Sequence, residues 1–256
     1  MRGLTGKRIL VAGGATGIGA ATAVRLGEEG ARLYLGDLND AGARDVAGKI
    51  RDAGGDAEAA RFDLADADSV ATLVAGAAEH LGGVDGLANV AADLSPETLG
   101  NDVALLEMDP AVWERTLRAN LIGFALLAKQ AIPHLIAAGG GAIVNTSSGA
   151  SWAGETTRPA YAASKAGINA LTRHIASTYG KQGVRANSVS PGAVLSETAL
   201  RTMGEKFQAK LLRGVTVGRL GKPEDLAQTI AFLLSDDADW VSGQVWSVNG
   251  GGGFRD

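Results

Sequence analysis

The chain has 256 residues, of which 46% are hydrophobic and 20% charged, and its formal net charge is −4 at pH 7. This composition suits one α/β domain, or two small ones, and the negative charge excludes a general electrostatic attraction to nucleic acid or to an anionic membrane. The absence of cysteine excludes thiol catalysis, disulfides and Cys-based zinc sites, and the three histidines are isolated, so we expect no metal site.

Short β-rich runs alternate with amphipathic stretches along the whole chain, which is typical of βαβ units and a parallel sheet. We expect strands over residues 8–12, 31–36, 57–62, 84–90, 142–146, 184–189 and 244–248. We expect helices over residues 17–29, 41–53, 66–81, 110–138, 159–180 and 223–234, a polar loop over 93–109, and one or two short helices within 193–216. No linker or repeat interrupts this alternation, which predicts a single domain over residues 1–256.

A glycine-rich turn, Gly13-Gly14-Ala15-Thr16-Gly17-Ile18-Gly19, follows the first expected strand and opens the first expected helix. Its glycines permit a tight turn and let the backbone approach a pyrophosphate at the positive end of the helix. The spacing is GxxxGxG rather than the GxGxxG fingerprint, and 37 glycines can produce chance matches. An ordinary βα turn is therefore the alternative.

The cofactor choice depends on Asp37, at the end of the second expected strand. A carboxylate there can bind a ribose diol and repels a 2′-phosphate, and Thr16 stands where a basic side chain would favour that phosphate. Both residues favour NAD over NADP. Asp37 could also cap the following helix, and Arg32 and Arg44 nearby keep NADP open.

Tyr161 and Lys165 are four residues apart in an expected helix, and Ser148 precedes the tyrosine by thirteen residues. Side chains at this helical spacing can meet. An ammonium group beside a phenol favours the phenolate, so we expect the pKa of Tyr161 to fall from about 10. With a serine hydroxyl to hold a substrate oxygen, these residues predict a proton-transfer site that acts on a carbonyl or an alcohol.

Together these motifs resemble the short-chain dehydrogenase/reductase family, in its compact branch with chains of about this length. The resemblance covers essentially the whole chain, and several motifs occur in order at the family's spacings. They are the turn at Gly13, Gly17 and Gly19, then Asp63, Asn89, Asn120, Ser148, Tyr161-x-x-x-Lys165 and Pro191-Gly192. The resemblance implies a Rossmann-type, doubly wound, seven-stranded parallel sheet with helices on both faces.

The resemblance implies that Tyr161 is the general acid/base and that Lys165 lowers its pKa and holds the nicotinamide ribose. It implies that Ser148 binds the substrate oxygen and that Asn120 keeps a water in a proton relay. Ser147 is the alternative to Ser148 for binding the substrate oxygen, and the thirteen-residue gap before Tyr161 favours Ser148. Asn120 could instead distort its helix by bonding to backbone.

The resemblance further implies cofactor contacts from the glycine turn, from the ends of strands and from the segment after the sixth strand. The residues are Gly13, Thr16, Gly17, Ile18, Gly19, Asp37, Leu38, Asp63, Leu64, Asn89, Ala91, Pro191, Gly192, Val194 and Ser196, besides Tyr161 and Lys165. Asp63 could alternatively be a plain helix N-cap.

The chain departs from the family pattern at three places. Ala12 replaces a usual threonine, Val90-Ala91-Ala92 replaces Asn-Ala-Gly, and Ser196 replaces a threonine while keeping the hydroxyl. We expect the glycine turn and the loop after the fourth strand to pack through methyl groups, with a small loss of stability and no loss of activity.

The substrate pocket is expected between the segments 93–97 and 149–159 and a lid over residues 193–216. Apolar residues in these segments predict a largely apolar site, among them Ala150, Trp152, Leu195 and Met203. We expect the substrate to be a secondary alcohol, a cyclic diol or the matching ketone. A 3-oxoacyl-thioester reductase is the alternative, although nothing resembles a basic patch for a carrier protein.

Two hypotheses belong to other classes of protein. A serine hydrolase is disfavoured because the stretch around Ser151 misses GxSxG by one residue, and His174 falls within a helix. A non-catalytic NAD-binding sensor would be expected to lose Ser148, Tyr161 or Lys165, and all three are present.

The expected helix 110–138 is apolar around too much of its circumference for one buried stripe, and residues 160–167 are rich in small side chains. The family uses these helices as an interface, so we expect a homotetramer. The apolar run 121–138 is interrupted by Lys129 and Pro133 and is too short to span a bilayer. Without an evident secretory signal, we expect a cytoplasmic protein.

Overall fold

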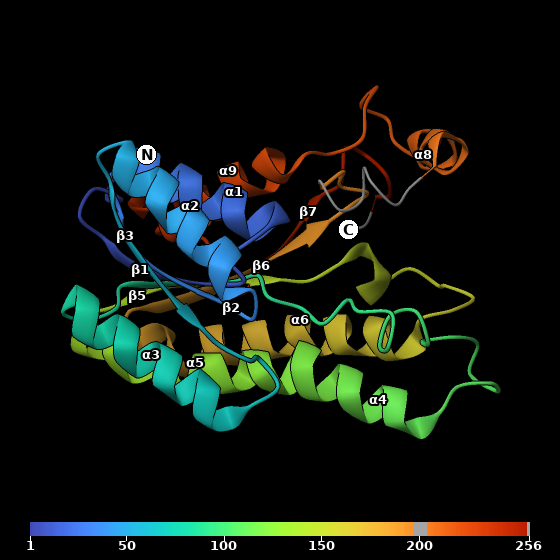
Figure 1. Cartoon of the computed structure of the whole chain (residues 1–256), viewed down its shortest axis with the longest axis horizontal. Coiled ribbons are helices and arrows are strands. Elements are labelled where there is room, and N and C mark those ends of the chain that lie inside the picture. The colour runs from blue at the N-terminus through green and yellow to red at the C-terminus, as the bar shows by residue number, and fades with distance from the viewer. Residues whose placement is uncertain (197–203, 255–256) are drawn as a thin grey trace.

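The computed structural model describes residues 1–196 and 204–254, and seven parallel strands form one sheet in the order β3-β2-β1-β4-β5-β6-β7 (Figure 1). The strands are β1 (Arg8–Ala12), β2 (Arg32–Asp37), β3 (Asp56–Arg61), β4 (Gly86–Asn89), β5 (Gly141–Thr146), β6 (Val184–Pro191) and β7 (Val245–Val248). The longer helices are α1 (Gly17–Glu28), α2 (Asp40–Asp52), α3 (Ala67–Leu81), α4 (Pro110–Leu117), α5 (Gly123–Ala137), α6 (Pro159–Tyr179), α8 (Glu205–Leu212) and α9 (Pro223–Leu234). The predicted α/β sheet with helices on both faces is confirmed.

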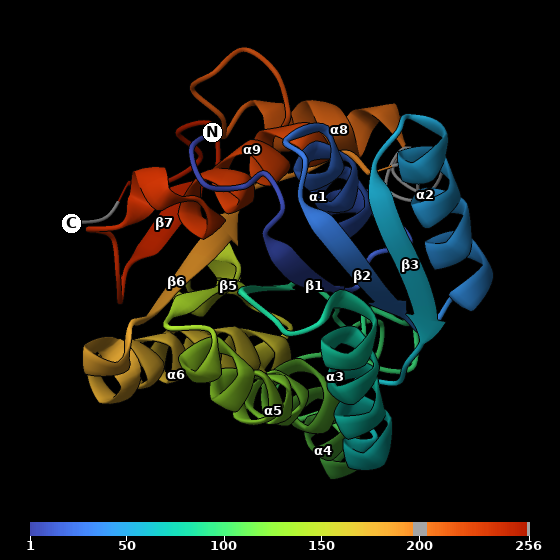
Figure 2. The ribbon, with the colours of Figure 1, turned by 90° about the vertical axis from the view of Figure 1, so that its left-hand side faces the viewer.

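The helices form two layers around the sheet. Figure 2 shows α1, α2 and α9 on one face, and α3, α4, α5 and α6 on the other. The strand order reverses between β1 and β4, which pair as neighbours although they are not consecutive. In sheets of this kind, ligands bind beyond the carboxyl ends of the strands at this reversal.

Strand β1 shows how the sheet divides the core. Its residues from Ile9 to Ala12 are fully buried. Ile9 and Val11 belong to the cluster under α1, α2 and α9, while Leu10 and Ala12 belong to the cluster under α3, α5 and α6. Alternate side chains of a strand point to opposite faces, so a continuous apolar run is needed where both faces are covered.

The prediction of one continuous helix over residues 110–138 was wrong. It begins at Pro110 after the N-cap Asp109, as expected, but a π-helical turn, η1 (Arg118–Ile122), separates α4 from α5. The stretch Pro110–Ala137 is long and apolar enough to cross a membrane, and half of its most apolar window is buried within the fold. Core helices of globular domains share that composition.

The glycine turn and the loop after β4 are joined by backbone as well as by methyl groups. The amides of Val90 and Ala91 both donate to the Ala12 carbonyl, each at 2.8 Å. A Cβ atom on Gly13 would lie 2.5 Å from the Ala91 nitrogen. The contact between the two loops therefore does not need the hydroxyl that Ala12 lacks.

Helix capping resolves two alternatives for the acidic residues near the cofactor motif. The N-cap of α2 is Asn39, whose side chain accepts from the Gly42 amide, so Asp37 is not the cap. The N-cap of α3 is Asp66, so Asp63 is not the cap either. Both carboxylates are left for other contacts.

Candidate active site

The end of β5 and the start of α6 bring three of the predicted catalytic residues together. Ser148 follows β5 and begins the short helix η2 (Gly149–Ser151), and its Oγ accepts from the Ala150 amide at 3.2 Å. Tyr161 lies in the first turn of α6, within hydrogen-bonding reach of the Ser148 side chain. Lys165 Nζ lies 5.6 Å from the centroid of the Tyr161 ring.

Lys165 is held in an apolar environment. It is 1% exposed, its Nζ donates to the Thr146 carbonyl at 2.9 Å, and Nζ lies 5.0 Å from the centroid of the Phe124 ring. Burial disfavours an ammonium group, and it lowers the pKa of Lys165 from 10.5 to about 7. The lysine is therefore poised to gain or lose a proton near neutrality.

The pKa of Tyr161 corrects the sequence-based expectation. Burial of the phenol raises its pKa above 10, although the hydrogen bond with Ser148 and the charge of Arg158 act in the lowering direction. The expectation considered the charge of the ammonium group beside the phenol and left out the burial of both groups. Here both groups lose water, and a lysine that titrates near pH 7 is a weaker source of positive charge.

The two adjacent serines have different surroundings. Ser147 is 2% exposed and its Oγ donates to the Lys165 carbonyl at 3.2 Å. Its hydroxyl is thus used to fasten α6 to the sheet. This leaves Ser148 as the serine beside the Tyr161 phenol, as the spacing predicted.

Asn120 lies within the π-helical turn η1 and is fully buried. Its side chain bonds the backbone of Asp93 twice: Oδ1 accepts from the amide at 2.7 Å, and Nδ2 donates to the carbonyl at 3.0 Å. The residue therefore fastens the start of the 93–109 loop. The alternative predicted for Asn120 was bonding to the backbone of its own helix. The side chain does bond to backbone, but to that of Asp93 in another segment.

The glycine turn brings backbone segments too close together for side chains at Gly13 and Gly19. A Cβ atom on Gly19 would lie 1.7 Å from the Gly13 carbonyl oxygen, and Gly13 and Gly17 have φ angles of 96° and 53°. Thr16, the N-cap of α1, makes no side-chain cap bond. The first amides of α1 thus remain available to an anion, and the turn fits the pyrophosphate of a dinucleotide.

Asp37 lies beside this turn with its carboxylate already oriented. One oxygen accepts from the Ala15 amide and the other from the Asn39 amide, both at 2.9 Å. The nearby arginines are engaged elsewhere: Arg32 pairs with Asp56 at 2.7 Å, and Arg44 pairs with Asp40 at 2.9 Å. Both carboxylate oxygens of Asp37 therefore already accept hydrogen bonds from backbone amides.

A chain of buried polar groups, which the sequence analysis missed apart from Asn89, runs beneath the site. Asn89 Nδ2 donates to Asn145 Oδ1 at 3.3 Å across the β4–β5 register. Asn145 Nδ2 donates to Thr172 Oγ1 at 2.9 Å, and that hydroxyl bonds Ser188 Oγ at 2.8 Å. Asn89 Oδ1 itself is buried and has no hydrogen-bond partner.

The other predicted cofactor residues lie along the carboxyl edge of the sheet. Leu38 is 58% exposed next to Asp37, and Leu64 is nearly buried after β3. Asp63 Oδ1 accepts from the Ala65 amide. After β6, which ends at Pro191, the Gly192 amide donates to the Val248 carbonyl and Val194 pairs with Gly221. A Cβ atom on Gly17 would lie 3.6 Å from Ser196, and Ile18 packs against the core.

Among the residues predicted for the substrate pocket, Met203 lies outside the described residues, as does the rest of the lid segment 197–203. Ala150 is buried, Trp152 is 38% exposed, and Leu195 is partly buried. The structure adds a C-terminal segment, residues 249–253, which was not predicted to take part in the pocket. A Cβ atom on Gly253 would lie 2.5 Å from the Trp152 ring.

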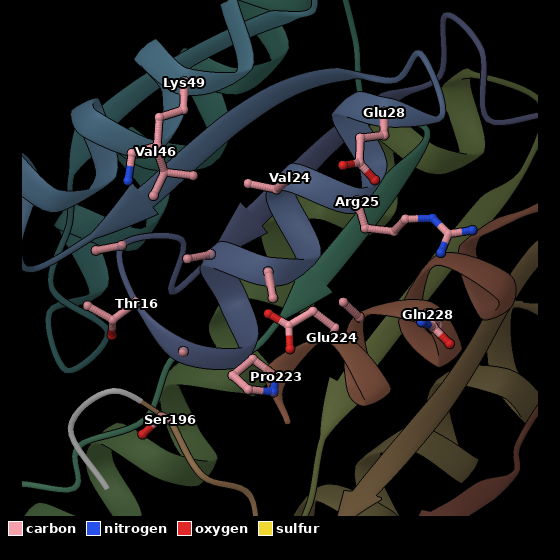
Figure 3. Close-up of a pocket in the computed structure, with 15 residues that line it drawn as sticks. Thr16, Val24, Arg25, Glu28, Val46, Lys49, Ser196, Pro223, Glu224 and Gln228 are labelled. Atoms are coloured by element: carbon pink, nitrogen blue, oxygen red, sulfur yellow. The ribbon is translucent and has the colours of Figure 1, made fainter. Parts of the chain in front are cut away.

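A cavity of about 570 Å³ lies on the outer side of the glycine turn, between α1, α2 and α9. Figure 3 shows Thr16 and Ser196 at its edge and Lys49, Arg25, Glu224 and Gln228 around it. Its lining includes none of Ser148, Tyr161 and Lys165. We place the candidate chemistry at those three residues because Ser148 and Lys165 lie beside the Tyr161 ring and burial shifts the pKa values of Tyr161 and Lys165.

Known proteins resemble this chain over nearly its whole length. A family model described as enoyl-(acyl carrier protein) reductase matches residues 12–252. A probable short-chain type dehydrogenase/reductase of Bradyrhizobium diazoefficiens is 44% identical over 248 residues, 96% of this chain and 87% of that protein. The cis-4-hydroxycyclohexanecarboxylate dehydrogenase of Sinomonas cyclohexanicum is 42% identical over 243 residues, 94% of each chain.

A solved structure has the same fold. It is a 7α-hydroxysteroid dehydrogenase complexed with NADH and 7-oxo glycochenodeoxycholic acid, with a TM-score of 0.91, 32% identity, and coverage of 97% of this chain and 94% of that one. The chain belongs to the short-chain dehydrogenase/reductase family. It is therefore an NAD(P)-dependent oxidoreductase that acts on a CH–OH group of a secondary alcohol or on the matching ketone.

The buried lysine predicts a pH-dependent effect on stability. The folded-state pKa of Lys165, about 7, lies below the ordinary 10.5, so the cost of burying the ammonium group is full below pH 7 and disappears as pH rises to 10.5. Lys165→Met should therefore raise the melting temperature relative to wild type more at pH 6.5 than at pH 9.5, by roughly 10 °C.

Thermal unfolding of the cofactor-free protein, followed by circular dichroism, measures this difference. The control is Lys49→Met, an exposed lysine on α2, for which the difference between the two pH values should be small. A Lys165→Met effect that is constant or grows with pH would contradict the assignment.

Proposed function

We propose that the chain transfers a hydride between NAD and a secondary alcohol or ketone carried on a ring, with Tyr161 as the general acid/base. The observation that carries the proposal is the proximity of Ser148 and Lys165 to the Tyr161 side chain. A bound nicotinamide supplies the hydride or accepts it. The roles below are those of the chain's own residues.

Proton transfer is the proposed task of Tyr161. In ketone reduction its phenol donates a proton to the substrate oxygen, and in alcohol oxidation its phenolate accepts one. Ser148 holds the same substrate oxygen by a hydrogen bond, which keeps it within reach of the phenol. A phenol whose pKa is raised by burial is a competent proton donor at neutral pH, and oxidation is expected to be faster at high pH.

Lys165 and Asn120 are the proposed route by which that proton is exchanged with solvent. Lys165, whose pKa is about 7, can pass a proton onward near neutrality. Asn120 is the proposed site of the relay water. The water would bind to hydrogen-bonding groups of Asn120 that are not already bonded to the Asp93 backbone. We propose that Lys165 also holds the nicotinamide ribose hydroxyls, a role that the family resemblance implies.

NAD is the proposed cofactor, supported by the preoriented carboxylate of Asp37 and by the pairing of Arg32 and Arg44 with carboxylates. The hydroxysteroid dehydrogenase with the same fold is complexed with NADH. The remaining cofactor residues, from Gly13 to Ser196, lie along one edge of the sheet and fit an extended dinucleotide.

A ring-borne alcohol or ketone is the proposed substrate class. Two of the similar proteins are named as dehydrogenases of a hydroxycyclohexane acid and of a hydroxysteroid. The apolar residues predicted for the pocket, among them Ala150, Trp152 and Leu195, would contact such a ring. We propose that the segment 193–216, which includes α8, closes over it as a lid.

Replacing the phenol tests the proposed chemistry. Tyr161→Phe should lower kcat by at least about a hundredfold, since it removes the proton donor, and leave the dissociation constant for NADH nearly unchanged. A panel of cyclic and open-chain alcohols and ketones, followed by NADH absorbance at neutral and high pH, identifies the substrate first. A turnover number close to that of wild type in Tyr161→Phe would refute the role of Tyr161 as general acid/base.

Replacing Asp37 tests the cofactor. The wild type should favour NAD over NADP in kcat/KM, and Asp37→Ala should narrow that preference by about tenfold, or about 1.4 kcal/mol. Asp45→Ala removes an exposed carboxylate from α2 and should leave the preference unchanged. A wild type that prefers NADPH would overturn the proposal for NAD.

A homotetramer is the proposed assembly. On one side, α5 and the π-helical turn leave apolar surface uncovered, with Ile122 42% exposed. On another, Trp240 and Phe254 are 99% and 82% exposed around β7. Light scattering should give four times the chain mass of 25.9 kDa, and a monomer would refute the assembly.

The lack of cysteine fits a proposed cytoplasmic location, which cell fractionation would test.

A further inference from the structure

The first turn of α6, which carries Tyr161, needs hydrogen-bond acceptors from outside the helix. The first amides of any α-helix have no partner within it. Pro159 has no amide hydrogen, so the amides of Ala160 and Tyr161 are the first in the helix that require an acceptor. The N-cap residue, Arg158, makes no side-chain cap bond.

Asp102 supplies these acceptors from the 93–109 loop. Its Oδ2 accepts from the Tyr161 amide at 2.7 Å, and its Oδ1 accepts from the Ala160 amide at 3.2 Å. The Arg158 amide donates to the Asp102 carbonyl at 2.8 Å. Asp102 is 2% exposed, so the carboxylate meets the positive end of the helix in a site shielded from water.

The residue before the helix is strained, which shows how firmly this junction is held. Arg158 has φ 65°, and it is the single non-glycine residue with a positive φ among residues 1–196 and 204–254. Its guanidinium pairs with Glu155 at 2.6 Å and lies 5.9 Å from the centroid of the Tyr161 ring. A left-handed conformation in a residue with a side chain persists only where its surroundings impose it.

The other end of the same loop is fastened at Asn120. Besides the two bonds from that side chain to the Asp93 backbone, Asp93 Oδ1 accepts from the Ser95 amide and from Thr98 Oγ1, both at 3.0 Å. Asp93 Oδ2 pairs with Arg115 of α4 at 3.1 Å. Residues 93–102 therefore connect the π-helical turn of Asn120 to the first turn of α6.

We propose that Asp102 is a positioning residue for the reaction, which fixes the first turn of α6 and thereby the Tyr161 phenol relative to Ser148. The proposal rests on the role proposed for Tyr161. Asp102 holds the backbone amide of Tyr161 itself, so loss of the cap displaces the group that carries the proton. A displacement of about 1 Å in such a group can cost about a hundredfold in rate.

The test compares two caps on two helices in the full-length protein. Asp102→Ala should lower kcat by about tenfold to a hundredfold, with KM and the NADH dissociation constant within about threefold of wild type. Asp109→Ala removes the side-chain cap of α4, where Asp109 Oδ1 accepts from the Ala111 amide at 2.9 Å, and should keep a wild-type kcat. Asp102→Asn retains an acceptor oxygen and should restore part of the lost turnover.

Hydrogen exchange, measured by mass spectrometry on the cofactor-free protein, reads the cap without turnover. Peptides over residues 158–164 should exchange faster in Asp102→Ala and not in Asp109→Ala. A kcat within twofold of wild type in Asp102→Ala, or an equal loss in Asp109→Ala, overturns the proposal. If Asp102→Ala does not fold, Asp102→Asn decides: slower turnover at unchanged KM supports the proposal, and wild-type turnover overturns it.

The failure of this proposal can be told apart from the failure of the proposed function. An inactive Tyr161→Phe together with a fully active Asp102→Ala rejects only the positioning role. An active Tyr161→Phe rejects the proposed function, and exchange over residues 158–164 still shows whether Asp102 holds the helix.

Discussion

The close packing of α6 against the end of β5 is the constraint on which the site depends. It places an ammonium group, that of Lys165, where water cannot reach it, with one carbonyl and two aromatic rings around it. The same packing uses the hydroxyl of Ser147 as a fastener and leaves that of Ser148 facing the phenol. A small shift of α6 would therefore alter the hydration of Lys165, the pKa values of Lys165 and Tyr161, and the distance between Tyr161 and Ser148 together.

The sheet determines where this packing can lead to chemistry. Because all strands are parallel, their carboxyl ends share one edge, and the glycine turn, Asp37, Asn89 and Ser148 all follow strands that end there. Residues far apart in the chain thus converge without long connections. The strand reversal between β1 and β4 opens that edge to a ligand, which agrees with the general location of sites in doubly wound sheets.

The elements and the central residues could be predicted from sequence because their signals are local. Apolar runs and helical spacing gave element bounds within one or two residues, and Tyr161 and Lys165 meet because they are one helical turn apart. The π-helical turn at Asn120 and the cap at Asp102 were not predicted. Both depend on contacts between segments 27 and 59 residues apart, which no local pattern encodes.

The direction of the Tyr161 pKa shift was predicted wrongly for a related reason. Sequence spacing gives the distance between a lysine and a tyrosine, but it does not give their access to water. Desolvation dominates here and acts on both groups. The hydrogen bonds that join Asn89 to Asn145, Thr172 and Ser188 were missed likewise, because polar residues at buried positions look unfavourable until their partners on neighbouring elements are known.

The contact between Gly253 and the Trp152 ring couples the end of the chain to the mouth of the site. Hydrogen bonds from Thr216 and Val217 to Gly250 join that same tail to the segment after α8. A protein fused to the C-terminus would pull on these glycines, whereas the amino terminus, tied to Glu29, lies at the other side of the molecule (Figure 1). Engineering that must leave the catalytic mouth undisturbed should therefore extend the chain from Met1.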